Sequence, residues 1–280
     1  MCTIMKYFTS KKLNEHLTLI TTITAENLFL VEGSNKAILI DTSEGAGDLK
    51  GFVEKLTSKP IEVILTHGHI DHAMGAVAFD KVYMNPADKA VYEAMSDIPQ
   101  RQEYIEMSVP KEKQAAVKQL ALLDANGGAE KFLPLKDGQR FDLGGTTLEM
   151  YSLAGHTPGM MVVLLVEDRI LIAGDAANTA TFLFDDYCAS VSDYQNNLQK
   201  LAKRLAGRYD KVYLSHHELE APRDLLQRVS SVCKDVLDGK ADNQRFDFMG
   251  KTAWIAKEVG PGFIRKDGGF GNIIYNKDNI

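Results

Sequence analysis

The histidines of this sequence occur in clusters, and the positions of the clusters constrain its fold more than any other feature. Six of the seven histidines fall in three short segments, and each segment directly follows a run of apolar and β-branched residues typical of a strand. Polar residues at strand ends lie on loops that converge on a site held by a rigid scaffold. We therefore expect an α/β fold that brings the three segments together. The segments are residues 67–72, His156 and residues 216–217, after strands expected to end at Leu65, near Leu153 and at Leu214.

The strand patterns form two blocks, each followed by helices. Several neighbouring strands are joined by turns too short for a crossover, which disfavours a doubly wound sheet. Two packed mixed sheets with helices outside, a four-layer αβ/βα sandwich, fit the pattern best. The expected strands are 17–23, 27–32, 36–40, 61–65, 141–143, 146–151, 162–166, 169–173 and 211–214, and the expected helices are 48–56, 192–205 and 222–237.

At 280 residues with 45% hydrophobic residues, the chain suits one large layered domain spanning 1–280. Residues 86–131 are rich in Lys, Gln, Glu and Ala, so we expect a helical insertion there that caps the site or forms a homodimer contact. Residues 221–280 are expected to add a helix and a closing hairpin at 263–274, with its turn at Gly268-Gly269.

Charge and cysteine usage limit the partners and the compartment. The net charge is −6 and no Lys/Arg stripe is present, which disfavours nucleic acid. No apolar stretch is long enough for a membrane span, and the first residues lack the apolar run of a secretory signal. Cys2, Cys188 and Cys233 are far apart, as expected of free thiols in a reducing compartment. We predict a cytoplasmic enzyme that acts on a small molecule.

The segment from His67 to His72 predicts a metal site, because it holds three histidines and an aspartate within six positions. In an extended turn His67 and His69 can share one metal, while Asp71 and His72 face a neighbouring one. Gly68 lets the backbone fold tightly between the first two ligands. Imidazole with carboxylate suits zinc, with iron or manganese as alternatives. A purely structural zinc is disfavoured because none of the cysteines lies nearby.

Several motifs in this order resemble the metallo-β-lactamase superfamily. Thr66-His67-Gly68-His69-Ile70-Asp71-His72 matches its HxHxDH signature, Leu39-Ile40-Asp41-Thr42 resembles the strand before it, Gly155-His156-Thr157-Pro158-Gly159 resembles its GHTPG segment and Gly174-Asp175 its GD step. The order and intervals resemble the family from about Thr18 to His217.

The resemblance implies a binuclear site. His67, His69 and His156 would hold one metal, and Asp71, His72 and one histidine of the third segment the other. Asp175 would bridge the two, and Asp41 would orient a ligand. The third segment departs from the family's Pro-Gly-His-Gly pattern, since the stretch here reads Leu214-Ser215-His216-His217-Glu218. His216 is favoured as the ligand because it is nearer the strand end, with His217 as the alternative.

This ligand set predicts a metal-dependent hydrolase. Two divalent metals, zinc in the first instance, would share a bridging hydroxide that attacks an ester, thioester, lactone, amide or phosphodiester centre. Asp71 would also serve as the proton acceptor or shuttle. The alternative is a non-haem iron oxidoreductase, of the sulfur dioxygenase or di-iron type.

The substrate stays open at the level of sequence. Asp175 stands where secreted zinc β-lactamases of the family often have Cys, which argues against antibiotic hydrolysis. Glyoxalase-II-like thioesterases share the motifs but bring a dedicated helical substrate domain. For a lactonase, Tyr187 and Tyr194 could contact the substrate, although a tyrosine there is more often part of the core or rim.

Overall fold

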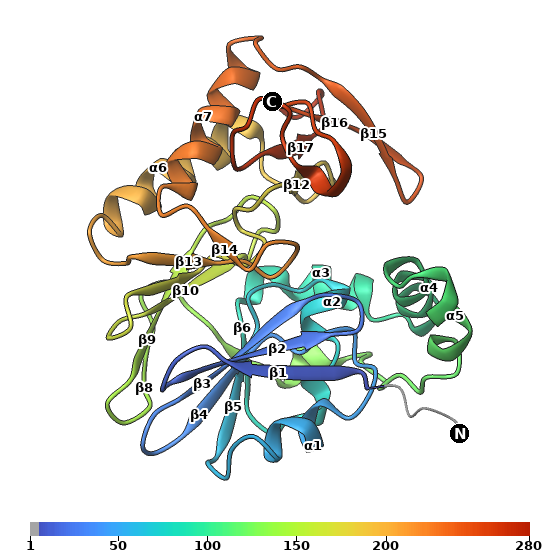
Figure 1. Ribbon diagram of the computed structural model, residues 1–280, viewed down its shortest axis with the longest axis vertical. Helices are drawn as coiled ribbons and strands as arrows, with labels where there is room; N and C mark the ends of the chain where they lie inside the picture. The colour runs from blue at the N-terminus through green and yellow to red at the C-terminus, as the bar shows by residue number, and fades with distance from the viewer. Residues whose placement is uncertain (1–5) are drawn as a thin grey trace. The chain divides into compact units, whose positions relative to one another are not determined.

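The computed structural model describes residues 6–280, and its internal contacts divide the chain into two compact units (Figure 1). Unit 1 extends to Lys136 and includes Arg140–Leu148. Unit 2 comprises Asp137–Gln139 and Glu149–Ile280. Cys2 lies outside the described residues.

Unit 1 contains a seven-stranded sheet whose spatial order follows the sequence. Its first four strands are antiparallel, and the last four, from β4 onward, are parallel. A parallel pair needs a crossover, and the helix α1 (Leu49–Glu54) supplies it between β4 and β5. All four residues of β4 are buried, as expected of a central strand covered on both faces. The strands are β1 (Phe8–Lys12), β2 (Leu17–Thr22), β3 (Asn27–Glu32), β4 (Ala37–Ile40), β5 (Ile61–Ile64), β6 (Val82–Met84) and β7 (Leu133–Pro134).

Short helices fill the rest of unit 1, including the expected helical stretch. Arg101 of α4 is fully buried and donates from Nε and Nη2 to the carbonyl oxygen of Glu44, at 3.0 and 2.7 Å, and from Nη1 to that of Leu123 at 2.7 Å. This arginine therefore fastens α4 to the loop after β4. The helices are α2 (Ile70–Ala73), η1 (Ala76–Ala78), η2 (Pro86–Asp88), α3 (Lys89–Met95), α4 (Ile98–Ser108), α5 (Lys111–Val117) and η3 (Gly128–Lys131).

A second, six-stranded mixed sheet has the order β14-β13-β11-β10-β9-β8. Two amphipathic helices, α6 (Val191–Arg204) and α7 (Leu225–Leu237), lie side by side and contribute Leu198 and Val229 to the core of unit 2 (Figure 1). The side chain that caps α6 is Ser190, which accepts from the Asp193 amide, so the helix begins one residue before the expected range of 192–205. The strands are β8 (Arg140–Asp142), β9 (Thr147–Ser152), β10 (Met161–Leu165), β11 (Ile170–Ile172), β13 (Lys211–Tyr213) and β14 (Glu220–Ala221).

A third sheet, of four strands, was not expected from the sequence. Its order is β12 (Thr181–Leu183), β17 (Ile273–Tyr275), β16 (Lys251–Ile255) and β15 (Gln244–Phe248). The hairpin predicted at 263–274 is wrong, because the hairpin is formed by β15 and β16. Its two-residue turn is Met249-Gly250, with φ values of 46° and 78°, and two positive φ values match the twist of a tight hairpin. Met249 hides this turn, because methionine is not a typical turn residue.

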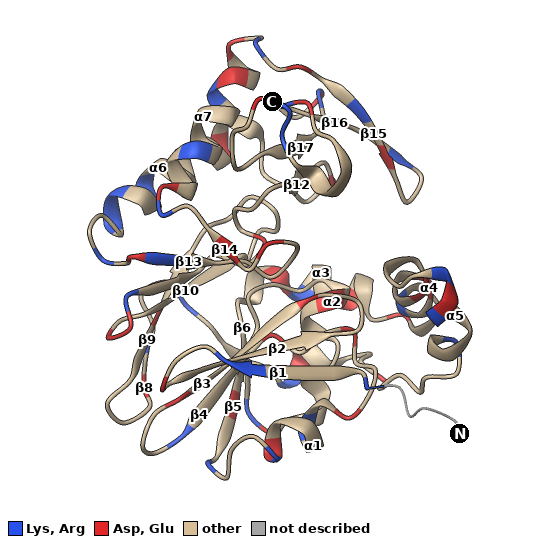
Figure 2. Cartoon of the chain, in the orientation of Figure 1, with Lys and Arg blue, Asp and Glu red and all other residues tan. Residues whose placement is uncertain are grey.

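The charged residues and the cysteines are distributed as in ordinary globular proteins. Basic and acidic residues alternate along the cartoon of Figure 2, and no long basic run appears along the chain in that view. Cys188 and Cys233 are buried and free. Within the described residues, no helix combines the length and the hydropathy that crossing a bilayer requires.

Candidate metal centre

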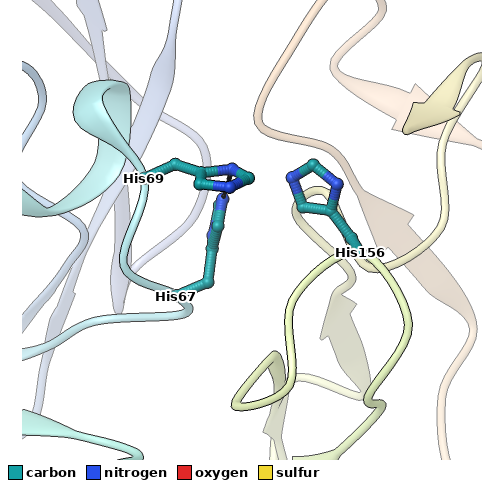
Figure 3. A group of neighbouring side chains, drawn as sticks. All are labelled: His67, His69 and His156. Carbon is teal, nitrogen blue, oxygen red and sulfur yellow. Dashed lines mark hydrogen bonds between the residues drawn. The ribbon is translucent and has the colours of Figure 1, made fainter. Parts of the chain in front are cut away.

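The first candidate set of ligands follows β5 in unit 1, and we call it the N-terminal set: His67, His69, Asp71 and His72. The rings of His67 and His69 meet edge to face with centroids 4.7 Å apart, and Nε2 of His67 is 3.1 Å from Nδ1 of His69 (Figure 3). His69 occupies the N-cap position of α2, so the two residues after it in the motif begin a helical turn. That turn places Oδ2 of Asp71 3.6 Å from Nε2 of His72. The set thus presents imidazole and carboxylate donors in two neighbouring pairs.

One buried carboxylate, Asp41, orients two of these histidines. Oδ1 of Asp41 accepts from the Thr66 amide at 2.7 Å, and Oδ2 accepts from the Thr66 hydroxyl at 2.7 Å and from Nδ1 of His72 at 2.8 Å. With its proton committed to Asp41, the Thr66 hydroxyl accepts from Nδ1 of His67 at 3.0 Å. Both imidazoles therefore carry hydrogen on Nδ1 and a lone pair on Nε2, which is the form that binds a metal.

Asp41 itself has a strained backbone, with φ of +63°. Positive φ is uncommon for a residue with a side chain and persists where surrounding structure holds it. Asp41 directly follows β4 and is 1% exposed. Its three hydrogen bonds compensate for burying the charge.

Two residues that support the N-terminal set were missed from the sequence. Asp88 is fully buried and accepts from the Gly68 amide at 2.9 Å. Tyr104 of α4 donates its hydroxyl to Oδ2 of Asp71 at 2.8 Å, and burial together with the Asp71 carboxylate raises the pKa of Tyr104 well above its usual value. Both partners come from segments far along the chain, and neither belongs to a motif. The helical segment thus contacts a candidate ligand directly.

Gly68 is required for a reason other than backbone freedom. A Cβ at this position would lie 2.8 Å from the Tyr92 amide nitrogen and 2.9 Å from the Asp88 carbonyl oxygen. Gly68 has no positive φ in the structure. Hence the glycine leaves room for the backbone at α3 to approach the loop between His67 and His69.

The second candidate set, the C-terminal set, lies in unit 2 and consists of His156, Asp175 and His216. Nδ1 of His156, in the loop after β9, donates to the Phe182 carbonyl at 2.8 Å, so that Nε2 carries its lone pair. Nε2 of His216 is 3.2 Å from Oδ2 of Asp175, and Asn178 donates to Oδ1 of Asp175 at 3.4 Å. The three residues come from three separate strand-end loops.

The two histidines of the third segment have different surroundings. His216 is half-buried and faces Asp175, whereas His217 is exposed, has φ of +60° and packs its ring 5.5 Å from that of Phe263. This arrangement favours His216 over His217 as a ligand. Tyr194 is fully buried and donates to the Ala176 carbonyl, which makes it a core residue.

The donor chemistry of both sets fits divalent metal ions. The N-terminal set offers oriented imidazoles beside a carboxylate, and so does the C-terminal set. Neutral imidazole with carboxylate is a donor combination for zinc, iron and manganese.

The sequence profile described as the metallo-beta-lactamase superfamily matches residues 21–216. The chain belongs to this superfamily. Among curated proteins it is 23% identical to acyl-coenzyme A thioesterase MBLAC2 of Gallus gallus, over 73% of this chain and 77% of the relative. It is 30% identical to the uncharacterized protein YobT of Bacillus subtilis (strain 168), over 54% of this chain and 61% of the relative.

Solved structures show the same fold. A metallo-beta-lactamase from Pontibacter korlensis superposes with a TM-score of 0.58 at 20% identity, covering 81% of this chain and 99% of that one. The metallo-beta-lactamase FIM-1 from Pseudomonas aeruginosa, in a mono-zinc form, superposes with a TM-score of 0.56 at 18% identity. The match covers 82% of this chain and 96% of that one. The expected superfamily and α/β sandwich class are confirmed, as is a superfamily hydrolase, and the oxidoreductase alternative is not favoured.

Proposed function

We propose that this chain is a metal-dependent hydrolase of acyl thioesters. The observation that carries the hydrolase is the Asp41–Thr66–His67 and Asp41–His72 network, which prepares two imidazoles to bind metal beside Asp71. The thioester is supported by relatives named as thioesterases: MBLAC2 of Homo sapiens, 23% identical over 209 residues, and the atrochrysone carboxyl ACP thioesterase AgnL7 of Paecilomyces divaricatus, 26% identical over 159 residues.

In this proposal the two candidate sets together hold two divalent ions, most simply zinc. His67, His69 and His156 would bind one ion, and Asp71, His72 and His216 the other, with Asp175 between them. The mono-zinc form of FIM-1 supports zinc as the metal. His217 would then line the site instead of binding the metal.

Each residue would have a defined part in hydrolysis. The bound metals would supply Lewis acidity toward the carbonyl oxygen and lower the pKa of water. Asp71 would take the proton of the attacking water and deliver it to the departing thiolate, as the new C–O bond replaces the C–S bond. Tyr104 would hold Asp71 in position through its hydroxyl, and Asp41 would keep the His67 and His72 tautomers.

The cytoplasm is the proposed compartment, and a small acyl thioester the proposed substrate. Support for the compartment comes from Cys188 and Cys233, which are buried and free, as is common in reducing conditions.

The test combines metal analysis with a substrate panel. Purified protein would be assayed against acyl thioesters, lactones, β-lactams and phosphodiesters, with bound metal measured in parallel. We expect two zinc ions per chain and turnover of thioesters. Asp71→Asn should lower kcat by about 100-fold or more, whereas Asp80→Asn, a fully exposed site in the same unit, should not change it. One iron per chain with oxygen consumption, or full activity in Asp71→Asn, would contradict the proposal.

A further inference from the structure

A group of phenylalanines in unit 2 forms an incompletely covered aromatic surface, which we call the phenylalanine wall. It consists of Phe182, Phe184, Phe246, Phe248 and Phe263. Neighbouring rings have centroids 5.0 to 6.3 Å apart, and Phe246 and Phe248 stack at an interplanar angle of 13°. Phe184 is buried, but the other four rings are only half-buried. The wall therefore keeps apolar surface in contact with solvent.

The hairpin β15–β16 builds this wall by strand alternation. Along β15 the half-buried Gln244, Phe246 and Phe248 share one face, and the exposed Arg245 and Asp247 share the other. β16 pairs with β17 only at Trp254 and Ile255, so the hairpin extends beyond the sheet (Figure 1). The two β15 rings contact Phe182 of β12, the strand at the opposite edge of that sheet.

The wall adjoins His156 of the C-terminal set at one end and His217, the neighbour of His216, at the other. The carbonyl of Phe182 orients His156 at 2.8 Å, and the rings of these two residues are 6.5 Å apart. At the other end Phe263 packs against His217, next to His216. His217 and Phe263 both have positive φ, 60° and 59°, and such strain in residues with side chains clusters at ligand clamps and active sites.

The cations of the β15–β16 hairpin are already paired. Arg245 contacts Asp247 at 3.0 Å, and Lys251 contacts Asp185 at 2.6 Å. Neutralised cations are poorly suited to an anionic carrier such as a phosphorylated thiol. An apolar group gains by leaving water for an aromatic surface, whatever its exact shape.

We propose that the phenylalanine wall binds the acyl portion of the substrate, and that this portion is an apolar chain of medium length. The inference rests on the proposed thioesterase function. The carbonyl to be cleaved would lie beside His156, with the chain running along Phe182, Phe248 and Phe246. The thiol carrier would lie away from the wall.

The kinetic test separates the acyl group from the carrier. Acetyl, hexanoyl and decanoyl thioesters of one thiol would be compared, and then the acetyl thioesters of different thiols. We expect kcat/KM to rise with acyl length, by up to about fourfold per methylene at full burial. In Phe248→Ala the decanoyl-to-acetyl ratio should fall about tenfold or more, and Phe248→Leu should restore most of it. Phe270→Ala, a half-buried phenylalanine of the same unit packed on another core cluster, should keep the ratio.

A binding test makes failure of the wall distinguishable from failure of the thioesterase. Decanoate binding to the metal-free protein would be measured by calorimetry in the wild type and in Phe248→Ala. Binding that is lost in the variant supports the wall even if no thioester is cleaved. Thioester cleavage with no dependence on acyl length, or equal decanoate binding in both proteins, would overturn it. Self-association that Phe248→Ala abolishes would also overturn it, since the wall would then be a contact between copies.

Discussion

The N-terminal and C-terminal sets use the same kinds of donor but are supported in different ways. In unit 1 a single buried carboxylate, Asp41, fixes both His67 and His72, and Asp88 and Tyr104 hold the rest of the segment. In unit 2 the main-chain carbonyl of Phe182 fixes His156. The orientation of the histidines in unit 1 therefore depends on particular side chains. The orientation of His156 depends on the position of the main chain at Phe182. The difference predicts that a single side-chain substitution disturbs the orientation of the ligands in the N-terminal set more than that of His156.

The largest expected effect comes from removing the carboxylate that serves two histidines. Asp41→Asn should weaken metal binding by about 10–100-fold, because the amide NH2 that replaces Oδ2 cannot accept from the Thr66 hydroxyl or from Nδ1 of His72. Phe182→Leu should leave metal affinity within about threefold, since the carbonyl that orients His156 remains. Competition with a chromophoric chelator measures both. Nitrogen NMR of the metal-free protein should show His67 and His72 losing their Nδ1–H form in Asp41→Asn alone. Equal losses of affinity in the two variants would show that the two sets are supported in the same way.

The next effect tests packing around the first set. Gly68→Ala should lower the free energy of unfolding by about 1–3 kcal/mol, because the new methyl meets the backbone of Asp88 and Tyr92 and cannot be relieved by a rotamer change. Gly260→Ala is the matched control, since its nearest neighbour would be 3.9 Å away and its φ is negative. Urea unfolding of both variants provides the measurement. A neutral Gly68→Ala would show that the loop between His67 and His69 can shift freely.

The last effect concerns pH and is confined to unit 1. Glu44 is fully buried, and burial together with the neighbouring Glu26 carboxylate raises its pKa well above 4.5. The folded state thus holds this proton more tightly than the unfolded state. Its contribution to stability is complete below about pH 4.5 and is lost as pH rises through the raised value.

Glu44→Gln should therefore flatten the fall in stability toward neutral and alkaline pH, by about 1 kcal/mol for each unit of pKa shift removed. Glu54→Gln, at an exposed position of the same unit, should leave the pH profile as in the wild type. The free energy of unfolding in urea at pH 5 and pH 8 gives the comparison. A variant with the wild-type slope would mean that Glu44 does not carry this proton.

The sequence identified what is contiguous or strongly periodic. His67 to His72 stand in one segment, and β2, β3 and β4 follow clear apolar runs, so both were predicted from the sequence. Asp88 and Tyr104 were missed because their partners, Gly68 and Asp71, lie 20 and 33 positions away in the sequence. No local motif identifies either residue. The third sheet was missed because β12 has only three residues, β15 alternates charged with aromatic residues, and the hairpin turn uses Met249.

The buried Arg101 has a consequence for how relatives of this chain can diversify. Its guanidinium donates to the main-chain carbonyls of Glu44, Ser96 and Leu123. Every residue type has such a carbonyl, whatever its side chain. The receiving loop also needs Gly45, because a Cβ there would lie 2.5 Å from Nη2 of Arg101. A helical segment transplanted into this scaffold would need an arginine at this position, and the receiving loop would need the glycine. The exposed residues around Arg101 can therefore vary in sequence.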